Sequence, residues 1–324
     1  MSGRHEKELK FENRINEKLK SAPSVLTEYY YSLIGSGKSY ATTYNYLNYV
    51  MAFVGFTFGD KCPEKFYLQV KPMHINKYIS SLRTKNVNGR VERTSDSIKT
   101  VQWSALNSFF QFLIPEYIKV NPVANTNRPK MKDNPNVTYL EPQEIAAMLA
   151  NVNEDANDKM KNRDLCLLKI GFSTGLRASA ILQIDIGDVD FKNNQIKVTE
   201  KGDYDNYIMF GDNLKQQLLF WIADRKKYFS ECDTNALCVS QCGKRLSPDM
   251  LAKLVTKYAK GATDKHVTPH VMRHSCATNL YEQTGDIYLC AQQLNHKNVS
   301  TTQRYAEISK EKRKAAANIL DGLI

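Results

Sequence analysis

Residues 268–305 read TPHVMRHSCATNLYEQTGDIYLCAQQLNHKNVSTTQRY, and four of the six histidines in the chain lie between residues 266 and 296. His270 and Arg273 are three positions apart, so a helix would place both on one face. His296 follows in a polar segment, and Tyr305 comes nine residues after it. Each of these residues alone is more often a surface or packing residue than a functional one. The ordered set is harder to explain by packing, so this stretch is a candidate site.

Two basic residues upstream extend the set. Arg177 lies in TGLRASAIL, just after a glycine turn, and Lys201 lies in VTEKGDYDNYI, at the tip of a predicted β-hairpin. The sequence contains no paired-carboxylate site, GxSxG elbow, P-loop or HExxH motif. These absences argue against the serine hydrolases, the P-loop nucleotidases and the zinc proteases with those motifs.

Together these residues resemble the tyrosine recombinases, the family of phage and transposon integrases. The segments TGLRASAIL, PHVMRHSCATNL and LNHKNVSTTQRYAEIS are similar to the three signature blocks of that family, in its order and spacing, over about residues 138–309. The resemblance implies a fold that is mainly α with a small β-sheet: a helical core-binding domain and a mixed α/β catalytic domain. It also implies a site-specific DNA recombinase that cuts and rejoins strands through a 3′-phosphotyrosyl intermediate.

The resemblance assigns three residues to the phosphate. Arg177 and Arg273 would clamp the non-bridging oxygens, because a guanidinium donates two parallel hydrogen bonds and stays charged at any working pH. His296 would donate a further hydrogen bond. These cations would neutralise the charge of the transition state, so no metal, ATP or other cofactor is expected.

The other three residues would handle the bond exchange and the protons. Tyr305 would be the nucleophile, and it needs help to lose its proton because a phenol has a pKa near 10. His270 would be the base or a proton partner. Lys201 would protonate the leaving 5′ oxygen.

The sequence departs from the family pattern at two positions beside the site and along one hairpin. Ala180 stands where relatives have Glu or Asp, so a supporting carboxylate is missing. Asn295 replaces the common glycine before His296, and Asn tolerates left-handed backbone angles, so we expect the turn to survive. The hairpin GDYDNYIMF has fewer basic residues than in relatives, which puts its DNA contacts in doubt.

The chain of 324 residues predicts two domains. Residues 121–136, NPVANTNRPKMKDNPN, have the composition of a linker. We therefore expect a charged extension over 1–20, a helical core-binding domain over 21–120, a linker over 121–137 and a catalytic domain over 138–324. Its segment 310–324, basic and then apolar, is expected to be exchanged between protomers.

Local patterns predict the elements. Ser39 would cap a helix, and a second helix from about Ser97 would place Ile98, Val101, Ala105, Phe109 and Phe112 on one face. Shorter helices are expected near residues 24–33 and 73–82. Trp103 is expected in the core. In the second part, residues 189–191 and 195–199 predict a hairpin, with a further strand over 207–210.

Net charge and cysteine content indicate the kind of partner and the cellular compartment. Lys and Arg exceed Asp and Glu by eleven, which favours a polyanionic partner. The seven dispersed cysteines predict free thiols, and no apolar run reaches the length of a membrane span. We expect a cytoplasmic, nucleoid-associated protein that binds double-stranded DNA. Its family works as a homotetramer on two duplexes, with accessory factors that set direction and no membrane partner.

Two alternatives stay open on the sequence alone. A type IB topoisomerase uses a very similar site as a monomer. A catalytically inactive recombinase fold could act as an architectural DNA-binding factor, which Ala180 weakly favours.

Overall fold

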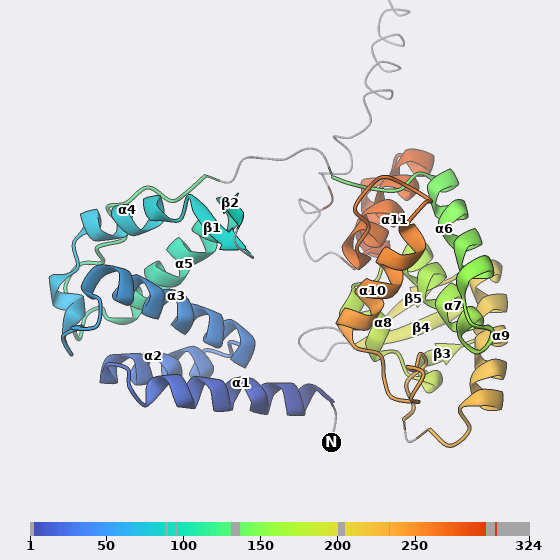
Figure 1. The fold of residues 1–324 in the computed structure, drawn as a ribbon, viewed down its shortest axis with the longest axis horizontal. Helices are drawn as coiled ribbons and strands as arrows, with labels where there is room; N and C mark the ends of the chain where they lie inside the picture. The colour runs from blue at the N-terminus through green and yellow to red at the C-terminus, as the bar shows by residue number, and fades with distance from the viewer. Residues whose placement is uncertain are drawn as a thin grey trace, which may run out of the picture. The chain divides into compact units, whose positions relative to one another are not determined.

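The protein is described by a computed structural model covering residues 3–87, 90–94, 96–130, 137–199, 205–232, 234–295 and 302 (Figure 1). The chain divides into two compact units, Met1–Asp133 and Asn134–Ile324. The division falls inside the segment whose composition predicted a linker.

The first unit is built from helices packed around aromatic side chains. Its elements are α1 (Gly3–Leu19), α2 (Ser24–Gly35), α3 (Tyr40–Phe58), η1 (Phe66–Gln69), α4 (Pro72–Ser81), β1 (Thr84–Val87), β2 (Arg90–Arg93) and α5 (Asp96–Phe112). Ser39 caps α3 by accepting a hydrogen bond from the backbone N–H of Thr42, as the sequence predicted. Trp103 packs against the core of this unit, also as predicted.

The face that α5 buries matches the predicted one only in part, since Ala105 and Phe109 are fully buried as expected. Ile98 and Val101 are exposed, whereas Leu106 and Phe110 are fully buried beside the predicted Phe109. The hydroxyl of Tyr78 in α4 donates to the side chain of Gln102. Because of this bond, the polar residue Gln102 can lie in the buried face. A search for regularly spaced apolar residues does not detect such a position.

A short antiparallel hairpin, β1–β2, connects α4 to α5 and was not predicted. Asn88 and Gly89 stand between its strands, and Asn-Gly is a strong local signal for a two-residue hairpin turn. The flanking strands are four residues each and mostly polar, so they lack the alternation that marks a half-buried strand.

Residues 121–130 of the predicted linker make specific contacts with the first unit, which their composition did not suggest. Asn121 and Val123 are buried, and Thr126 accepts a hydrogen bond from the indole N–H of Trp103 at 2.8 Å. The hydroxyl of Thr100 reaches the carbonyl of Pro129 at 3.1 Å. Hydrogen bonds to α5 therefore order a segment that has little apolar surface to bury.

The second unit combines helices with a small sheet. Its elements are α6 (Pro142–Asp155), α7 (Asp158–Thr174), α8 (Ala178–Gln183), η2 (Ile186–Asp188), β3 (Val189–Asp190), β4 (Gln195–Thr199), β5 (Asp205–Met209), α9 (Asp212–Tyr228), α10 (Pro248–Ala259), α11 (Pro269–Thr284) and α12 (Ile287–Gln293). The sheet is antiparallel with strand order β3-β4-β5. The predicted hairpin and third strand are confirmed.

Helix α7 is the central element of this unit and contacts α6, α8, α9 and α11 (Figure 1). Ten of its seventeen residues are buried, so it is apolar on most sides. It ends at Gly175, which has a φ of +63° and starts the turn into α8. The core of the unit thereby fixes the turn that carries Arg177.

All seven cysteines are free thiols, as predicted. Within the described ranges, no helix has both the length and the hydropathy needed to cross a membrane.

Candidate active site

Arg273 is held in place by two backbone carbonyls. Thr268 caps α11 by accepting from the backbone N–H of Val271, so Arg273 lies near the start of this helix. Its side chain is only 3% exposed. Nη1 donates to the carbonyl of Gly175 and Nη2 to the carbonyl of Leu294, both at 2.7 Å. A guanidinium carries five N–H donors, and these bonds use two of them.

The same turn brings Arg177 into the site. Gly175, whose carbonyl accepts from Arg273, lies two residues before Arg177, the N-cap of α8. Arg177 itself is exposed. The structure therefore brings the two predicted phosphate clamps together, one buried and one at the surface.

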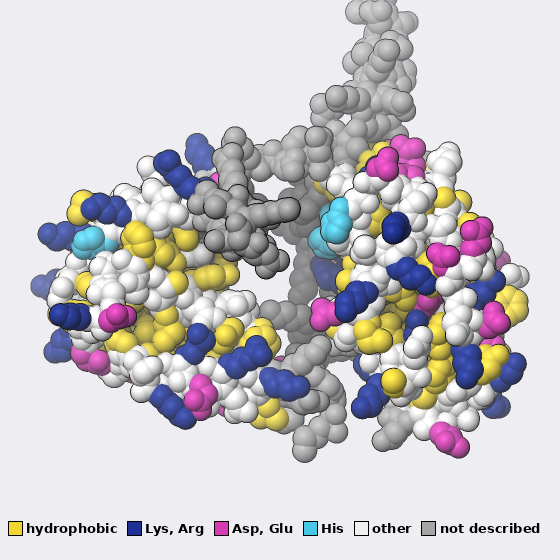
Figure 2. Space-filling view, viewed as in Figure 1, with side chains coloured by type: hydrophobic (Ala, Val, Ile, Leu, Met, Phe, Trp, Pro, Cys, Tyr) yellow, Lys and Arg dark blue, Asp and Glu magenta, His cyan; other side chains and the backbone are white. Residues whose placement is uncertain are grey.

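His270 lies one turn before Arg273 on α11 and is exposed. Its ring meets that of His274 edge-on, with ring centroids 4.8 Å apart. His274 is half-buried, so it backs His270 from the protein side. Figure 2 shows histidine side chains reaching the surface of the second unit, with Lys and Arg side chains nearby.

The turn after α12 adopts the backbone predicted for it. Asn295 has a φ of +49°, in the left-handed region that glycine usually occupies. Its N–H donates to the carbonyl of Gln292 at 2.9 Å. The asparagine therefore keeps the turn that ends directly before His296.

Three predicted site residues, Lys201, His296 and Tyr305, lie outside the described residues, as does the segment 310–324. The strands on either side of Lys201 are described, and they pair as far as Thr199 and Asp205. Lys197 and Asp205 form an ion pair of 2.9 Å across them. In the sequence Lys201 falls between these two paired strands, and its predicted place at the tip of the hairpin stays a prediction.

Other groups near the arginines do not compete for the chemistry. Burial raises the pKa of the Cys276 thiol to about 12, although the nearby Arg273 opposes the rise. Cys276 is therefore a neutral thiol at physiological pH and a poor nucleophile. Ala180, where relatives carry an acid, packs against the core of the unit. Among the described residues, no three His, Cys, Asp or Glu side chains are grouped to hold a metal ion.

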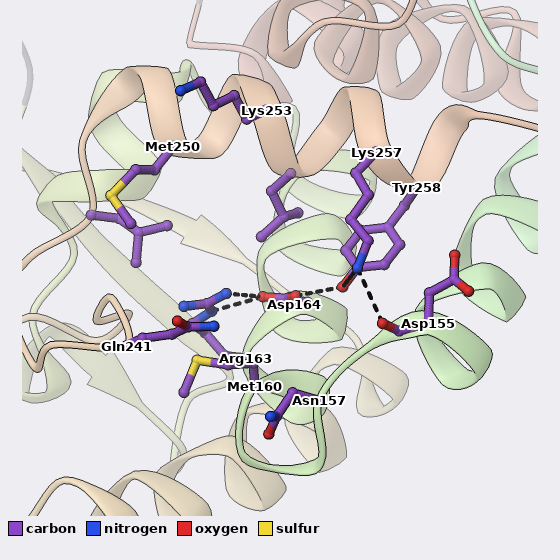
Figure 3. A pocket seen from close by; sticks show the side chains of 12 residues that line it. Asp155, Asn157, Met160, Arg163, Asp164, Gln241, Met250, Lys253, Lys257 and Tyr258 are labelled. Atoms are coloured by element: carbon purple, nitrogen blue, oxygen red, sulfur yellow. Dashed lines mark hydrogen bonds and ion pairs between the residues drawn. The ribbon is translucent and has the colours of Figure 1, made fainter.

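A cavity of about 340 Å³ lies between α7 and α10, apart from these residues (Figure 3). Arg163 pairs with Asp164 at 2.6 Å, and the hydroxyl of Tyr258 donates to the same carboxylate at 2.7 Å. Arg163 also donates to the carbonyl of Val239 at 2.9 Å. These bonds link α7, α10 and the 239 loop, so we read the network as structural support.

Sequence reasoning missed the groups that hold Arg273. The carbonyls of Gly175 and Leu294 leave no trace in residue identity, because every residue has a carbonyl. Ser275, two positions after Arg273, is fully buried and bonds to the chain near residue 140. Only its place next to the predicted site residues could have drawn attention to it.

Comparison with known proteins decides the family. Residues 138–312 match the model of the phage integrase family, which is more than half of the chain. This chain belongs to the phage integrase family, the tyrosine recombinases. It is 33% identical over 214 residues to tyrosine recombinase XerD of Staphylococcus epidermidis, covering 64% of this chain and 70% of that protein. It is 30% identical over 233 residues to tyrosine recombinase XerC of Escherichia coli, covering 71% and 76%.

Solved structures agree on the fold of this recombinase. The XerH site-specific recombinase bound to palindromic difH substrate aligns with a TM-score of 0.67 at 23% identity, covering 87% of this chain and 80% of that chain. The Tn1549 transposon integrase in complex with transposon right end DNA aligns with a TM-score of 0.68 at 21% identity, covering 90% and 98%. The predicted fold class is confirmed.

The protein is thus a site-specific DNA recombinase, an enzyme of DNA strand transfer. The comparisons do not favour the topoisomerase or the inactive architectural factor.

Proposed function

We propose that this recombinase cleaves DNA with Tyr305 as the nucleophile and Arg177 and Arg273 as the phosphate clamp. The observation that carries the proposal is the fixation of Arg273 by two carbonyls, one of which belongs to the turn that presents Arg177. Two cations held at one turn suit the non-bridging oxygens of a single phosphodiester.

The proposed step exchanges one phosphate ester for another. The phenolic oxygen of Tyr305 bonds to phosphorus, and the bond from phosphorus to the 5′ oxygen breaks. The phenolic proton passes to His270, and Lys201 supplies a proton to the leaving oxygen. A 3′-phosphotyrosyl bond and a free 5′ hydroxyl result, and the reverse attack by another 5′ hydroxyl rejoins the strand without ATP.

The clamp would act on the transition state. Charge grows on the non-bridging oxygens as the tyrosine attacks, and fixed donors in a site that excludes water stabilise it strongly. Because Arg273 is buried, water does not compete for the hydrogen bonds that its N–H groups donate. His296, placed directly after the left-handed Asn295, would add a further hydrogen bond to the phosphate.

The test is covalent trapping on a nicked suicide duplex carrying a site selected by binding from a random library. Wild type should yield a protein–DNA adduct that Tyr305→Phe abolishes. Tyr288→Phe is the matched control, because Tyr288 is an exposed tyrosine of the same unit, on α12, and should leave adduct formation unchanged. An adduct from Tyr305→Phe, or none from wild type on its selected site, would refute the mechanism.

We further propose that the recombinase acts as a homotetramer on two duplexes, with the segment 310–324 exchanged between protomers and accessory factors setting direction. The family membership and the basic-then-apolar sequence of that segment support the proposal. We propose as well that the protein works in the cytoplasm, at the nucleoid, where a DNA recombinase meets its substrate. Sedimentation with duplex DNA should give four protomers per two duplexes, and removal of residues 310–324 should leave smaller assemblies.

The two units would serve as core-binding domain and catalytic domain. The division at Asp133 and Asn134 supports separate folding of the two. Expressed alone, residues 137–324 should bind the selected duplex more weakly than the full chain, because half of the proposed contacts are missing. Equal affinity of the fragment and the full chain would contradict this division of labour.

A further inference from the structure

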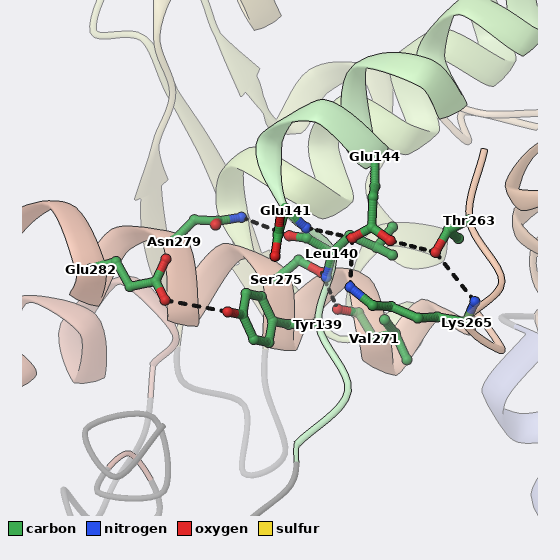
Figure 4. Close-up of polar contacts among 10 residues, drawn as sticks. All are labelled: Tyr139, Leu140, Glu141, Glu144, Thr263, Lys265, Val271, Ser275, Asn279 and Glu282. Atoms are coloured by element: carbon green, nitrogen blue, oxygen red, sulfur yellow. Dashed lines mark hydrogen bonds and ion pairs between the residues drawn. The ribbon is translucent and has the colours of Figure 1, made fainter. Parts of the chain in front are cut away.

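Residues 137–144, which we call the strap, begin just after the division between the two units and cross directly onto α11 (Figure 4). The backbone N–H of Leu140 donates to the hydroxyl of Ser275 at 2.8 Å, and the side chain of Asn279 donates to the carbonyl of Leu140 at 3.1 Å. Both polar backbone groups of one strap residue are therefore bonded to side chains one turn apart on α11.

The strap contacts reach the framework that holds Arg273. Ser275, fully buried and two residues after Arg273, donates onward to the carbonyl of Val271 at 2.8 Å. Val137 packs against the small cluster of Ala277 and Leu294, and the carbonyl of Leu294 accepts from Arg273. A displacement of the strap therefore moves the helix that carries the arginine and presses on a residue that orients it.

A second set of contacts ties the strap to the segment that leads into α11. The carboxylate of Glu144 accepts from the ammonium of Lys265 at 2.6 Å and from the hydroxyl of Thr263. It also accepts from the backbone N–H of Glu141 at 2.8 Å. Lys265 lies five residues before His270, so Glu144 fixes the approach of the chain to the other candidate catalytic residue of α11.

These contacts have the arrangement expected of a coupling element. The strap is rigid where it meets α11, because Leu140 is fully buried and both its backbone groups are bonded. It is continuous in sequence with the segment that joins the two units. Coupling between sites is carried by such contiguous packed and hydrogen-bonded contacts.

We propose that the strap positions α11 for cleavage, with Ser275 and Asn279 as positioning residues, and that it transmits changes in the segment between the units to Arg273 and His270. The proposal rests on the proposed function, because it assigns those two residues to catalysis. It adds that the joining segment is a regulatory input to the active site and more than a passive tether.

The experiment combines hydrogen exchange with single-turnover cleavage in the full chain. Ser275→Ala/Asn279→Ala should raise amide exchange over residues 268–276 and slow adduct formation at saturating DNA by about 2- to 30-fold. The dissociation constant for DNA should stay within twofold, which separates positioning from binding. Thr284→Ala is the matched control: it removes a hydroxyl from the same helix that bonds within the helix and to Asp286 but not to the strap.

An insertion of Gly-Ser between Asn134 and Pro135 tests transmission. In wild type it should slow cleavage and raise exchange over residues 268–276, and in the double variant it should add little, because the connection is already broken. Asn279→Ala alone, at a half-buried position, replaces the double variant if that protein does not fold.

The outcomes separate the two proposals. If wild type forms no Tyr305-dependent adduct, the proposed reaction fails. The exchange data still test whether the strap positions α11. Unchanged amide exchange over residues 268–276 in the strap variants overturns the proposal that the strap positions α11. So does an insertion whose effect is the same in wild type and in the double variant.

Discussion

Gly175 offers the sharpest test of how the turn before α8 builds the active site. The residue has a φ of +63°, and a β-carbon there would lie 2.5 Å from Cδ2 of Leu294 and 3.1 Å from Sγ of Cys276. Ordinary contacts between carbon atoms are about 3.5–4.0 Å, so Gly175→Ala must push Leu294 away by about 1 Å. The methyl group that must move belongs to Leu294, and Leu294 and Gly175 supply the two carbonyls that hold Arg273, so the substitution strains both residues that orient the guanidinium.

The expected loss of stability in Gly175→Ala is the sum of two free-energy costs. A left-handed backbone costs a residue with a β-carbon about 1–2 kcal/mol, and overpacking a core costs about 1–3 kcal/mol. Gly175→Ala should therefore destabilise the second unit by about 3 kcal/mol, or about 6–12 °C in melting temperature for a unit of this size. Misplacement of a catalytic group by about 1 Å costs about 100-fold in rate. We therefore expect Gly175→Ala to lower the cleavage rate by up to about 100-fold.

The assay is single-turnover adduct formation on the suicide duplex, together with calorimetric melting. Gly187→Ala is the matched control, because a β-carbon there meets nothing within 4 Å. The control should melt and cleave like wild type. The reasoning fails if Gly175→Ala cleaves within threefold of wild type and melts at the same temperature.

Three further predictions concern charge and titration. Arg273→Lys keeps the charge but not the planar fork, so cleavage should fall about 100- to 1000-fold while DNA affinity changes little; single-turnover rates near wild type would contradict the fork. Native protein treated with iodoacetamide at pH 7.5 should be labelled at exposed Cys242 but not at Cys166 or Cys276; mass spectrometry of the peptides checks this. A hydrogen bond with Cys238 together with burial raises the pKa of Cys166, and burial raises that of Cys276. Burial alone would raise the pKa of Glu144, but hydrogen bonds from Lys265, Thr263 and Glu141 outweigh it and lower the pKa below its ordinary value. Its stabilisation should be complete above about pH 5 and lost as pH falls through the lowered pKa, so urea midpoints of wild type and Glu144→Gln should converge in acid; a constant difference would refute the linkage.

The sequence was sufficient wherever local chemistry decides structure. The three-residue spacing of His270 and Arg273 pointed to a helix with both on one face, and the structure has that helix in α11. Asn295 marked a left-handed turn, which its φ of +49° bears out. Each prediction depended on residues within a few positions of one another, where spacing and backbone preference act directly.

The sequence was insufficient wherever distant segments meet. Ser275 and Leu140 are 135 positions apart, and their bond exists only because the strap crosses α11. The order of residues 121–130 likewise depends on bonds to α5, such as that from Thr100 to Pro129. No local pattern records such pairings, since a buried serine or a carbonyl is compatible with many partners.

In the proposed phosphate clamp, the different burial of Arg273 and Arg177 gives the two arginines different parts. Carbonyl oxygens are dipoles, so they orient the guanidinium of Arg273 without cancelling its formal charge. Burial then makes that orientation rigid, and a rigid donor needs no rearrangement when charge develops on the phosphate. Arg177 is exposed, so a phosphate of a docking duplex can reach it from solvent. Ala180 supplies no carboxylate, and the carbonyls of Gly175 and Leu294 orient Arg273. Dependence on those two carbonyls is why a single β-carbon at Gly175 should cost more activity here than its local strain alone would suggest.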